Sequence, residues 1–207
     1  MIRDFRKVMI KNIIFDVGRV LVDVRWDEIM QELGFEGELL KRVSNATVCS
    51  DTWGEYDRGK WSDEEILNTF ITNAPDLERE IRLFMEHEHE SIKEFPYAKD
   101  WVKSFKDKGY HCYILSNYPR RIYENTCQER GYEEFVDGAV YSYQVHMIKP
   151  EPVIYQTLLK RYGLVPEECV FIDDNLANIE AARKLGIHAI HFNTRQNTEQ
   201  ELQKLGV

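Results

Sequence analysis

A short apolar run that ends in an aspartate constrains the fold of this chain most. Residues 13–15 read Ile-Ile-Phe, Asp16 follows them directly, and Val17 and Gly18 come next. Short apolar runs of this kind are typical of buried parallel strands. In open α/β sheets, ligands bind at the carboxyl ends of such strands. The run therefore predicts that Asp16 lies at the functional edge of a parallel sheet, with a simple turn-capping role as the alternative.

Apolar runs and amphipathic stretches alternate along the second half of the chain. The runs predict strands, and the stretches between them predict helices that end at glycines. Such alternation is typical of an α/β fold, so we expect a Rossmann-like, doubly wound parallel sheet. After the strand at 13–15, we expect the further strands at residues 110–115, 139–141, 169–172 and 187–192.

The region from residue 24 to residue 95 has a different pattern. It shows no convincing strand, and its periodicity predicts helices at 27–33, 38–48, 63–73 and 76–93. Ser62 and Glu65 are spaced as a capping box at the start of the third helix. We therefore expect an α/β core domain formed by residues 1–23 and 96–207, and a helical cap domain, residues 24–95, inserted between the first two core strands.

The composition argues against two classes of partner. The 207 residues carry a formal net charge of −9, whereas nucleic acids and anionic membranes bind basic surfaces. A small anionic substrate stays compatible with this charge, because a few local cations are enough to hold a phosphate. The four cysteines lie far apart without a C-x-x-C pair, which predicts reduced thiols and no zinc site.

Export and membrane signals are also missing from the sequence. Residues 1–7 contain no apolar core of the kind that signal peptides have. No apolar run approaches the roughly 18 residues that a membrane span needs. We therefore expect a cytoplasmic protein, and the sequence does not predict its oligomeric state.

Polar residues follow four of the predicted strands. Asp16 follows the first, Ser116 the second, Lys149 comes shortly after the third, and Asp173 and Asp174 follow the fourth. Alone, each has an ordinary structural explanation, as a solvated lysine, a turn residue or a helix cap. Because the carboxyl ends of parallel strands meet at one edge of a sheet, we expect the four signals to converge on one crevice.

The residue types at this edge suit the chemistry of phosphoryl groups. Several carboxylates without a histidine form an oxygen-rich site for a hard cation such as Mg²⁺. Lys149, the Ser116 hydroxyl and the N–H groups of the helix expected near Pro119 form an anion site beside it. A free carboxylate that attacks phosphorus would form an aspartyl-phosphate.

The order of these motifs is similar to that of the haloacid dehalogenase (HAD) superfamily, in the subgroup with a helical cap after the first motif. The resemblance covers nearly the whole chain, including 56–62 in the cap, and its motifs lie at 16–21, 115–117, 149–150 and 171–175. It implies that Asp16 is the nucleophile and a Mg²⁺ ligand, and that Asp173 binds the same ion. It also implies that Asp174 stabilises the metal site without being a direct ligand of the ion. The residues that it implies hold the phosphate are Ser116, Asn117 and Lys149.

One position departs from the superfamily pattern. Most phosphatases of the superfamily carry a second Asp two residues after the nucleophile as general acid and base, and this chain has Gly18 there. The resemblance still implies that the backbone carbonyl of Gly18 binds the metal. Without an acid, an acidic leaving group such as the anomeric hydroxyl of a sugar 1-phosphate is favoured over an alkyl alcohol. The D-x-G first motif with a D-D-N fourth motif accordingly resembles a bacterial α-D-glucose-1-phosphate phosphatase subgroup.

Three residues of the predicted cap are candidates for choosing the substrate. Tyr56, Arg58 and Trp61 form a cluster together with Trp53. These side chains either hang over the crevice or pack the cap helices together, and the sequence does not separate the two. We expect Tyr56, Arg58 and Trp61 to contribute to substrate specificity.

The sequence as a whole predicts an enzyme, a Mg²⁺-dependent phosphatase that acts on a small phosphorylated metabolite, for example a hexose 1-phosphate. One alternative is a haloacid dehalogenase, which lacks the acid and uses no metal. The Asp173–Asp174 pair opposes it, because carboxylates around an anionic substrate need a cation. Another alternative is a phosphometabolite-binding protein with little turnover, which the presence of Asp16, Lys149 and Asp173 opposes.

Overall fold

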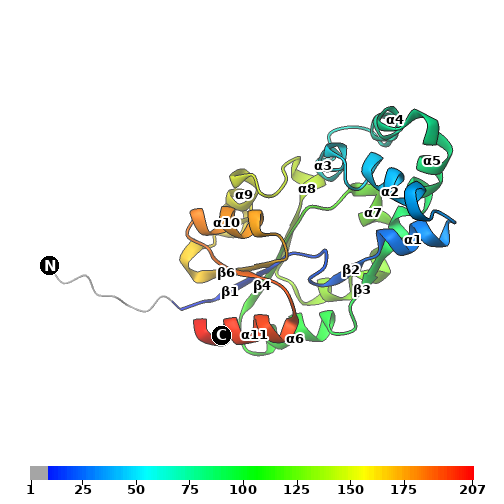
Figure 1. Cartoon of the computed structure of the whole chain (residues 1–207). Helices are drawn as coiled ribbons and strands as arrows, with labels where there is room; N and C mark the ends of the chain where they lie inside the picture. Colours follow the sequence, from blue (N-terminus) through cyan, green and yellow to red (C-terminus); the bar gives the residue numbers. More distant parts are fainter. Residues whose placement is uncertain (1–8) are drawn as a thin grey trace.

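The computed structural model describes residues 9–207 and shows a five-stranded sheet at the centre of the chain (Figure 1). Residues 1–8 lie outside the described residues. They include residues 1–7, for which we expect no signal peptide. The strands lie in the order β5-β4-β1-β6-β7, and each neighbouring pair is parallel. Their bounds are β1 Asn12–Phe15, β4 His111–Ser116, β5 Gly138–Tyr141, β6 Cys169–Asp173 and β7 His188–His191. The α/β parallel-sheet prediction is confirmed, and each predicted strand end is shifted by at most one residue.

Alternating side chains of β1 face the two helical layers of the sheet. Phe15 packs edge-on against Trp101 of α6 at 5.3 Å between ring centroids, whereas Ile14 belongs to the cluster on the opposite face. Figure 1 shows α6 and α11 on one side of the sheet and α9 and α10 on the other. Because both faces are covered, β1 is fully buried and its polar end, Asp16, can only be reached from the edge. These helices span α6 Ala98–Asp107, α9 Pro152–Tyr162, α10 Leu176–Lys184 and α11 Arg195–Leu205.

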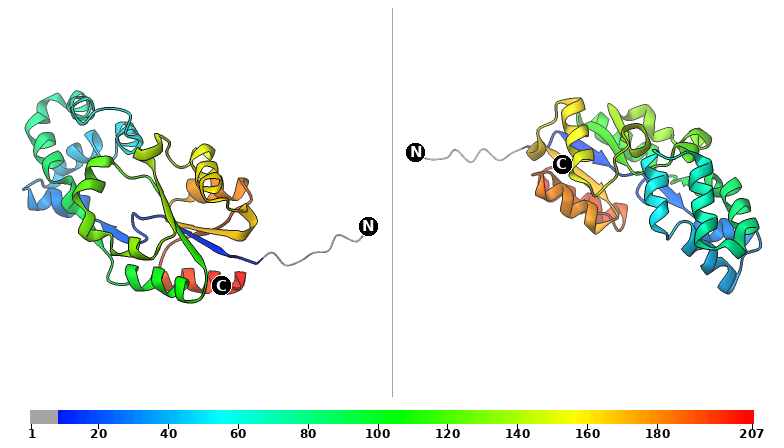
Figure 2. Two further views of the ribbon diagram at one scale, coloured as in Figure 1. Left: turned by 180° about the vertical axis from the view of Figure 1, so that it is seen from behind. Right: turned by 90° about the horizontal axis from the view of Figure 1, so that it is seen from above.

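A group of helices, residues 25–91, lies between two short strands, and we call it the helical insert. Figures 1 and 2 show it gathered at one end of the molecule, on the side of the carboxyl ends of the strands. It contains α1 Trp26–Glu32, α2 Gly37–Ala46, α3 Asp51–Arg58, α4 Asp63–Asn73 and α5 Glu78–His87, with the 3-10 turns η1 Pro75–Leu77 and η2 Glu88–Ser91. The chain leaves the core through β2 Val22–Val24 and returns through β3 Ile92–Glu94, which pair antiparallel.

Two expectations for this region were wrong. Residues 24–95 do contain a strand, β3, because a three-residue strand is too short to show a periodic pattern. The helix expected at 76–93 ends at His87 and is followed by η2 and β3. The helix α3 was not predicted, and this omission matters for the site.

The remaining short elements connect the core strands. They are α7 Arg120–Asn125, η3 Cys127–Glu129, η4 Gly131–Phe135, α8 Ser142–Val145 and η5 Pro166–Glu168. In residues 9–207, no helix has both the length and the apolar character needed to cross a membrane.

The capping box at the start of α4 provides a test of the insert's local stability. Ser62 Oγ accepts a hydrogen bond from the Glu65 N–H at 3.2 Å, and the Ser62 N–H donates to Glu65 Oε2 at 2.8 Å. We expect Ser62→Ala to lower the free energy of unfolding by about 0.5–2 kcal/mol, because the cap bond is lost. Thr69→Ala, which removes an exposed hydroxyl from the same helix, is the matched control in chemical denaturation. An equal loss in both variants would contradict the cap's contribution.

Candidate active site

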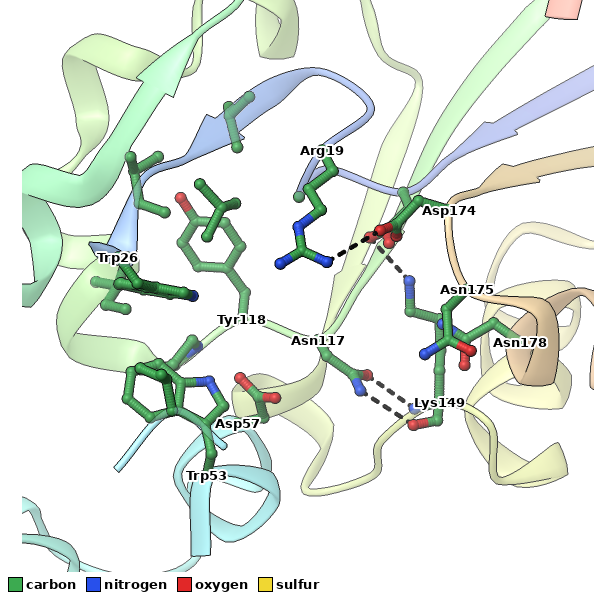
Figure 3. Close-up of a pocket in the computed structure, with 18 residues that line it drawn as sticks. Arg19, Trp26, Trp53, Asp57, Asn117, Tyr118, Lys149, Asp174, Asn175 and Asn178 are labelled. Carbon is green, nitrogen blue, oxygen red and sulfur yellow. Dashed lines mark hydrogen bonds and ion pairs between the residues drawn. The ribbon is translucent and has the colours of Figure 1, made fainter. Parts of the chain in front are cut away.

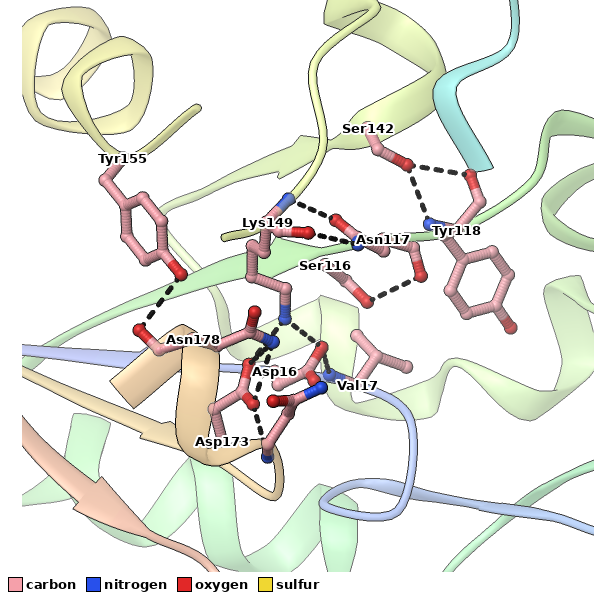
Figure 4. A network of polar contacts seen from close by, with 11 residues as sticks. Asp16, Val17, Ser116, Asn117, Tyr118, Ser142, Lys149, Tyr155, Asp173 and Asn178 are labelled. Carbon is pink, nitrogen blue, oxygen red and sulfur yellow. Dashed lines mark hydrogen bonds and ion pairs between the residues drawn. The ribbon is translucent and has the colours of Figure 1, made fainter. Parts of the chain in front are cut away.

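Two strand ends and one loop bring Asp16, Asp173 and Lys149 into direct contact. Asp16 follows β1, Asp173 ends β6, and Lys149 comes from the loop after α8. The Lys149 ammonium lies 2.8 Å from Asp16 Oδ1 and 2.6 Å from Asp173 Oδ2 (Figure 4). All three side chains are almost completely buried. The predicted convergence on one sheet edge is therefore present for these three residues.

Burial determines the charge balance of this cluster. Burial raises the pKa of Asp16 to about 8, although the Lys149 ammonium opposes the shift. Burial would lower the pKa of Lys149, but Asp16 and Asp173 together raise it above its usual value. The lysine therefore stays charged, and the pKa of Asp16 is raised mainly by burial, with a smaller contribution from the charge of Asp173.

Asn117 holds the backbone of Lys149 in place. The Lys149 N–H donates to Asn117 Oδ1 at 2.8 Å, and Asn117 Nδ2 donates to the Lys149 carbonyl at 3.0 Å. Because both polar ends of the side-chain amide are engaged in this pair, Asn117 positions the lysine. The phosphate-binding role expected for Asn117 stays a prediction. Ser116 is buried at the same sheet edge, where its hydroxyl lies 3.4 Å from the Asn117 carbonyl.

Asn178 orients Asp173 in the same way, although the sequence patterns predicted no role for Asn178. Its Nδ2 lies 3.0 Å from both carboxylate oxygens of Asp173, and the Asn175 N–H donates to Asp173 Oδ1 at 2.8 Å. Tyr155 of α9 in turn donates to the Asn178 carbonyl at 3.1 Å. The position of this asparagine, five residues after Asp173 and at the start of the next helix, is the sequence feature that could have indicated its role.

A third carboxylate completes a set suited to a hard cation. One oxygen each of Asp16, Asp173 and Asp174 lies within 4.8 Å of the others. Burial and the neighbouring Asp173 raise the pKa of Asp174, whose carboxylate is also 3.7 Å from Arg19 Nη1. Oxygen ligands of this type and the uncompensated negative charge fit Mg²⁺. The backbone of Gly18 lines the same cavity.

A cavity of about 390 Å³ opens in front of these carboxylates (Figure 3). Its size falls in the range of roughly 300–1,000 Å³ that is usual for small-molecule sites. Both the core and the helical insert contribute to its wall. From the insert come Trp26, Val48, Trp53 and Asp57, and from the core come Asp16, Arg19, Asn117, Tyr118, Ile122, Lys149, Asp174 and Asn178.

The three predicted specificity residues do not line this cavity. Tyr56 is buried inside the insert, where its hydroxyl donates to Glu88 at 3.0 Å. Arg58 turns away and forms a two-bond ion pair with Glu151 at 2.8 and 3.1 Å, and Trp61 is 41% exposed. Of the two open alternatives, the structure therefore does not place these three side chains over the cavity, and their contribution to substrate specificity stays a prediction.

The opposite face of α3 supplies the cavity wall instead. Trp53 and Asp57 are four residues apart and share one helix face, which points into the cavity (Figure 3). Because the sequence pattern did not reveal α3, it could not assign these faces. Trp53 was weighed as a candidate without a decision, and Asp57 was missed.

Comparisons with known proteins agree with this architecture. The family model of haloacid dehalogenase-like hydrolases matches residues 10–186. The chain is 29% identical to D-ribitol-5-phosphate phosphatase of Bacteroides thetaiotaomicron, and the match covers 94% of this chain and 97% of that protein. It is also 24% identical to drimenol cyclase drtB of Aspergillus calidoustus, over 95% of this chain but 37% of that longer protein.

Solved structures share the fold at low sequence identity. A HAD family enzyme of Bacteroides thetaiotaomicron, in complex with magnesium and inorganic phosphate, superposes with a TM-score of 0.71 at 23% identity, covering 90% of this chain and 96% of that one. L-2-haloacid dehalogenase of Xanthobacter autotrophicus gives 0.66 at 17% identity, with 95% and 83% covered. By its family match and its shared fold, this chain belongs to the haloacid dehalogenase-like hydrolases.

Proposed function

We propose that this chain is a Mg²⁺-dependent phosphatase that hydrolyses a small phosphorylated metabolite through an aspartyl-phosphate on Asp16. The observation that carries the proposal is the contact of a buried Asp16 with the Lys149 ammonium at the mouth of a small-molecule cavity. A carboxylate in this position attacks phosphorus, and the adjacent ammonium neutralises the phosphoryl oxygens. The phosphatases among the relatives support the same reaction.

The charges around the cavity explain why a metal is part of the proposal. Four carboxylates, those of Asp16, Asp57, Asp173 and Asp174, face two cations, Arg19 and Lys149. A phosphate dianion would be repelled from this excess of negative charge. Asp16 and Asp173 would hold Mg²⁺ directly and Asp174 would support the ion beside them, with the Gly18 carbonyl as the further ligand that the family resemblance implies. When bound, the ion supplies the positive charge that draws the phosphoryl group to Asp16.

The protein residues divide the remaining work. Asp16 attacks in line with the leaving group, and Lys149 binds the phosphoryl oxygens. Asn117 and Asn178 hold the lysine and Asp173 in place through the bonds described above. We keep the Ser116 hydroxyl as a proposed phosphate contact, because it lies at the same sheet edge.

A phosphorylated carbohydrate is the substrate class we propose. Two relatives are a D-ribitol-5-phosphate phosphatase and a phosphorylated carbohydrates phosphatase of Thermotoga maritima. The cavity wall combines aromatic side chains, Trp26 and Trp53, with polar groups such as Asp57, which suits a ligand with hydroxyl groups on a carbon frame. The D-x-G first motif adds hexose 1-phosphates as candidates within this class.

The helical insert is proposed to act as a lid over the cavity. It contributes part of the cavity wall, and it contacts the core through the Arg58–Glu151 pair and through Arg121 of α7, whose Nε lies 3.4 Å from Glu88 of η2. Opening these contacts would admit the substrate, and closing them would exclude water from Asp16. Residues 24–95 would then form the cap domain and the rest of the chain the core domain.

The haloacid dehalogenase reaction is the second candidate, because solved dehalogenases share the fold. It also fits the missing acid at Gly18. The cluster of Asp16, Asp173 and Asp174 argues against it, since a metal-free site would place this negative charge beside a carboxylate substrate. A binding protein with little turnover would not require the attacking position of Asp16.

The first test removes the proposed nucleophile. We expect Asp16→Asn to lower turnover of phosphomonoesters by 10⁴-fold or more, on the order seen when a nucleophile is removed, because an amide does not attack phosphorus. Steady-state hydrolysis and thermal melting are measured together. Asp27→Asn, at an exposed position of α1, is the matched control. Unchanged hydrolysis by Asp16→Asn would show that another residue performs the attack.

The second test concerns the metal. We expect activity to require Mg²⁺, to vanish in excess EDTA and to return when Mg²⁺ is added. Asp173→Asn should weaken Mg²⁺ binding at least about tenfold, because the amide keeps the shape of the ligand but loses its charge. Titration calorimetry with Mg²⁺ measures this affinity without turnover. Full activity in EDTA would instead favour the dehalogenase reaction.

The third test asks whether the cavity wall of the insert selects the substrate. We expect Trp53→Phe to change the ratio of kcat/KM between sugar phosphates of different size by about tenfold, because one wall contact is worth roughly 1–3 kcal/mol. Hydrolysis of a small aryl phosphate should change less. Trp61→Phe, at a position outside the cavity, is the matched control. Equal changes on all substrates would mean that Trp53 only supports the packing of the insert.

A further inference from the structure

The cavity contains a carboxylate that none of the roles above uses. Asp57, near the end of α3, faces the cavity from the helical insert, while Asp16 faces it from the core (Figure 3). A substrate phosphate bound at Asp16 would direct its leaving group away from Asp16, because attack and departure are in line. The wall opposite the core is the one to which the insert contributes Asp57.

Contacts between the insert and α8 hold the backbone of Asp57 in place. Ser142 Oγ donates to the Asp57 carbonyl at 2.5 Å. The same oxygen accepts from the Tyr118 N–H at 2.8 Å (Figure 4). The contact uses the backbone of Asp57, so its carboxylate stays turned toward the cavity.

The two residues after Asp57 reinforce this position. His146 Nδ1 lies 3.1 Å from the Arg58 carbonyl oxygen. The Arg58 guanidinium forms the two-bond ion pair with Glu151 that is described above. Gly59 is in the left-handed region with φ 67°, and a Cβ there would lie only 2.8 Å from Tyr143 Cβ. A glycine is therefore needed for α3 to end this close to α8.

The environment of Asp57 favours a carboxyl group that holds a proton near neutral pH. Burial raises the pKa of Asp57 to about 7, although Lys149 opposes the shift. This matches the requirement that a general acid titrate near the working pH. The other charged or titratable groups on the elements around it are Glu55 and Arg58 on α3, His146 after α8, and Asp16, Arg19 and Asp174 at the cavity.

We propose that Asp57 is the general acid and base of the reaction, supplied by the insert in place of the side chain that Gly18 lacks. The inference rests on the proposed phosphatase function. Arg19, which lines the same cavity, is a poorer donor because a guanidinium does not release its proton in proteins and it already pairs with Asp174.

The proton transfers balance over the two half-reactions. As Asp16 forms a bond to phosphorus and the bond to the leaving oxygen breaks, the Asp57 carboxyl gives its proton to that oxygen and releases an alcohol. The Asp57 carboxylate then takes a proton from a water whose oxygen attacks the aspartyl-phosphate. The phosphorus–Asp16 bond breaks, phosphate leaves, and both side chains return to their starting states.

The test compares two aryl phosphates of similar size in wild type and Asp57→Asn. The phenol released from phenyl phosphate has an ordinary pKa of about 10, so the departing phenolate needs a proton. The 2,4-dinitrophenolate released from 2,4-dinitrophenyl phosphate leaves without one. We expect Asp57→Asn to lower kcat/KM on phenyl phosphate by about 10²-fold or more and to leave kcat/KM on the dinitrophenyl ester within about threefold. The comparison uses kcat/KM because this constant covers only the steps up to release of the phenol, and not the later attack of water on the aspartyl-phosphate, which both esters share. Asp51→Asn, exposed at the start of the same helix, is the matched control.

A pH profile gives a second measurement that a supporting role would not change. In wild type, kcat/KM on phenyl phosphate should fall as pH rises above about 7, because a deprotonated Asp57 has no proton to donate. The ionisation of an enzyme group that affects the hydrolysis of both esters equally cancels in the ratio of the two kcat/KM values. Asp57→Asn should lose this pH dependence of the ratio, and Asp57→Glu should restore part of it.

The outcomes separate this inference from the function on which it rests. Equal losses of kcat/KM on both esters, or no loss on either, would overturn the role of Asp57 as the acid, while a dependence on Asp16 and Mg²⁺ keeps the phosphatase proposal. Absence of hydrolysis of both esters by the wild type would overturn both. A selective loss on phenyl phosphate at unchanged melting temperature supports the inference.

Discussion

The site depends on one buried ammonium between two buried carboxylates. Lys149 contacts Asp16 and Asp173 from a position that is almost inaccessible to water. Removing one partner of such a group typically costs about 3–5 kcal/mol, because a charge is left uncompensated in the interior. The lysine therefore stabilises the close approach of the two strand ends. It also leaves the carboxylates with an excess of negative charge, which is the condition for binding a cation and then a phosphate.

Amide side chains make this arrangement rigid. Asn117 forms two hydrogen bonds with the backbone of Lys149, and Asn178 donates to the carboxylate of Asp173. Neither amide carries a charge, so neither changes the charge balance of the cluster. A site preorganised by neutral groups keeps its electrostatic forces for the substrate and the transition state.

Much of the core could be predicted from the sequence, because buried parallel strands are continuous apolar runs and their carboxyl ends share one edge. That geometry brings Asp16 and Asp173 together, and the loop after α8, held by Asn117, adds Lys149. The insert was less predictable. The strand β3 is three residues long, and α3 shows its two faces only through contacts with distant segments, such as the Arg58–Glu151 pair 93 residues apart. Sequence reasoning therefore chose Arg58 and Tyr56, which face away from the cavity, over Asp57.

Placing the proton donor on the insert has a consequence for how the site works. In a phosphatase with an acid beside its nucleophile, the core alone holds both reacting groups. With the proposed roles, the nucleophile Asp16 follows β1 and the proton donor Asp57 lies on α3, which rests on α8 through Ser142 and Gly59. Formation of the aspartyl-phosphate from an alkyl ester would then require closure, whereas the same step with an ester that leaves unaided would not. Closure of the insert would thereby select the substrate twice, once by the shape of the Trp53 wall and once by delivery of the proton.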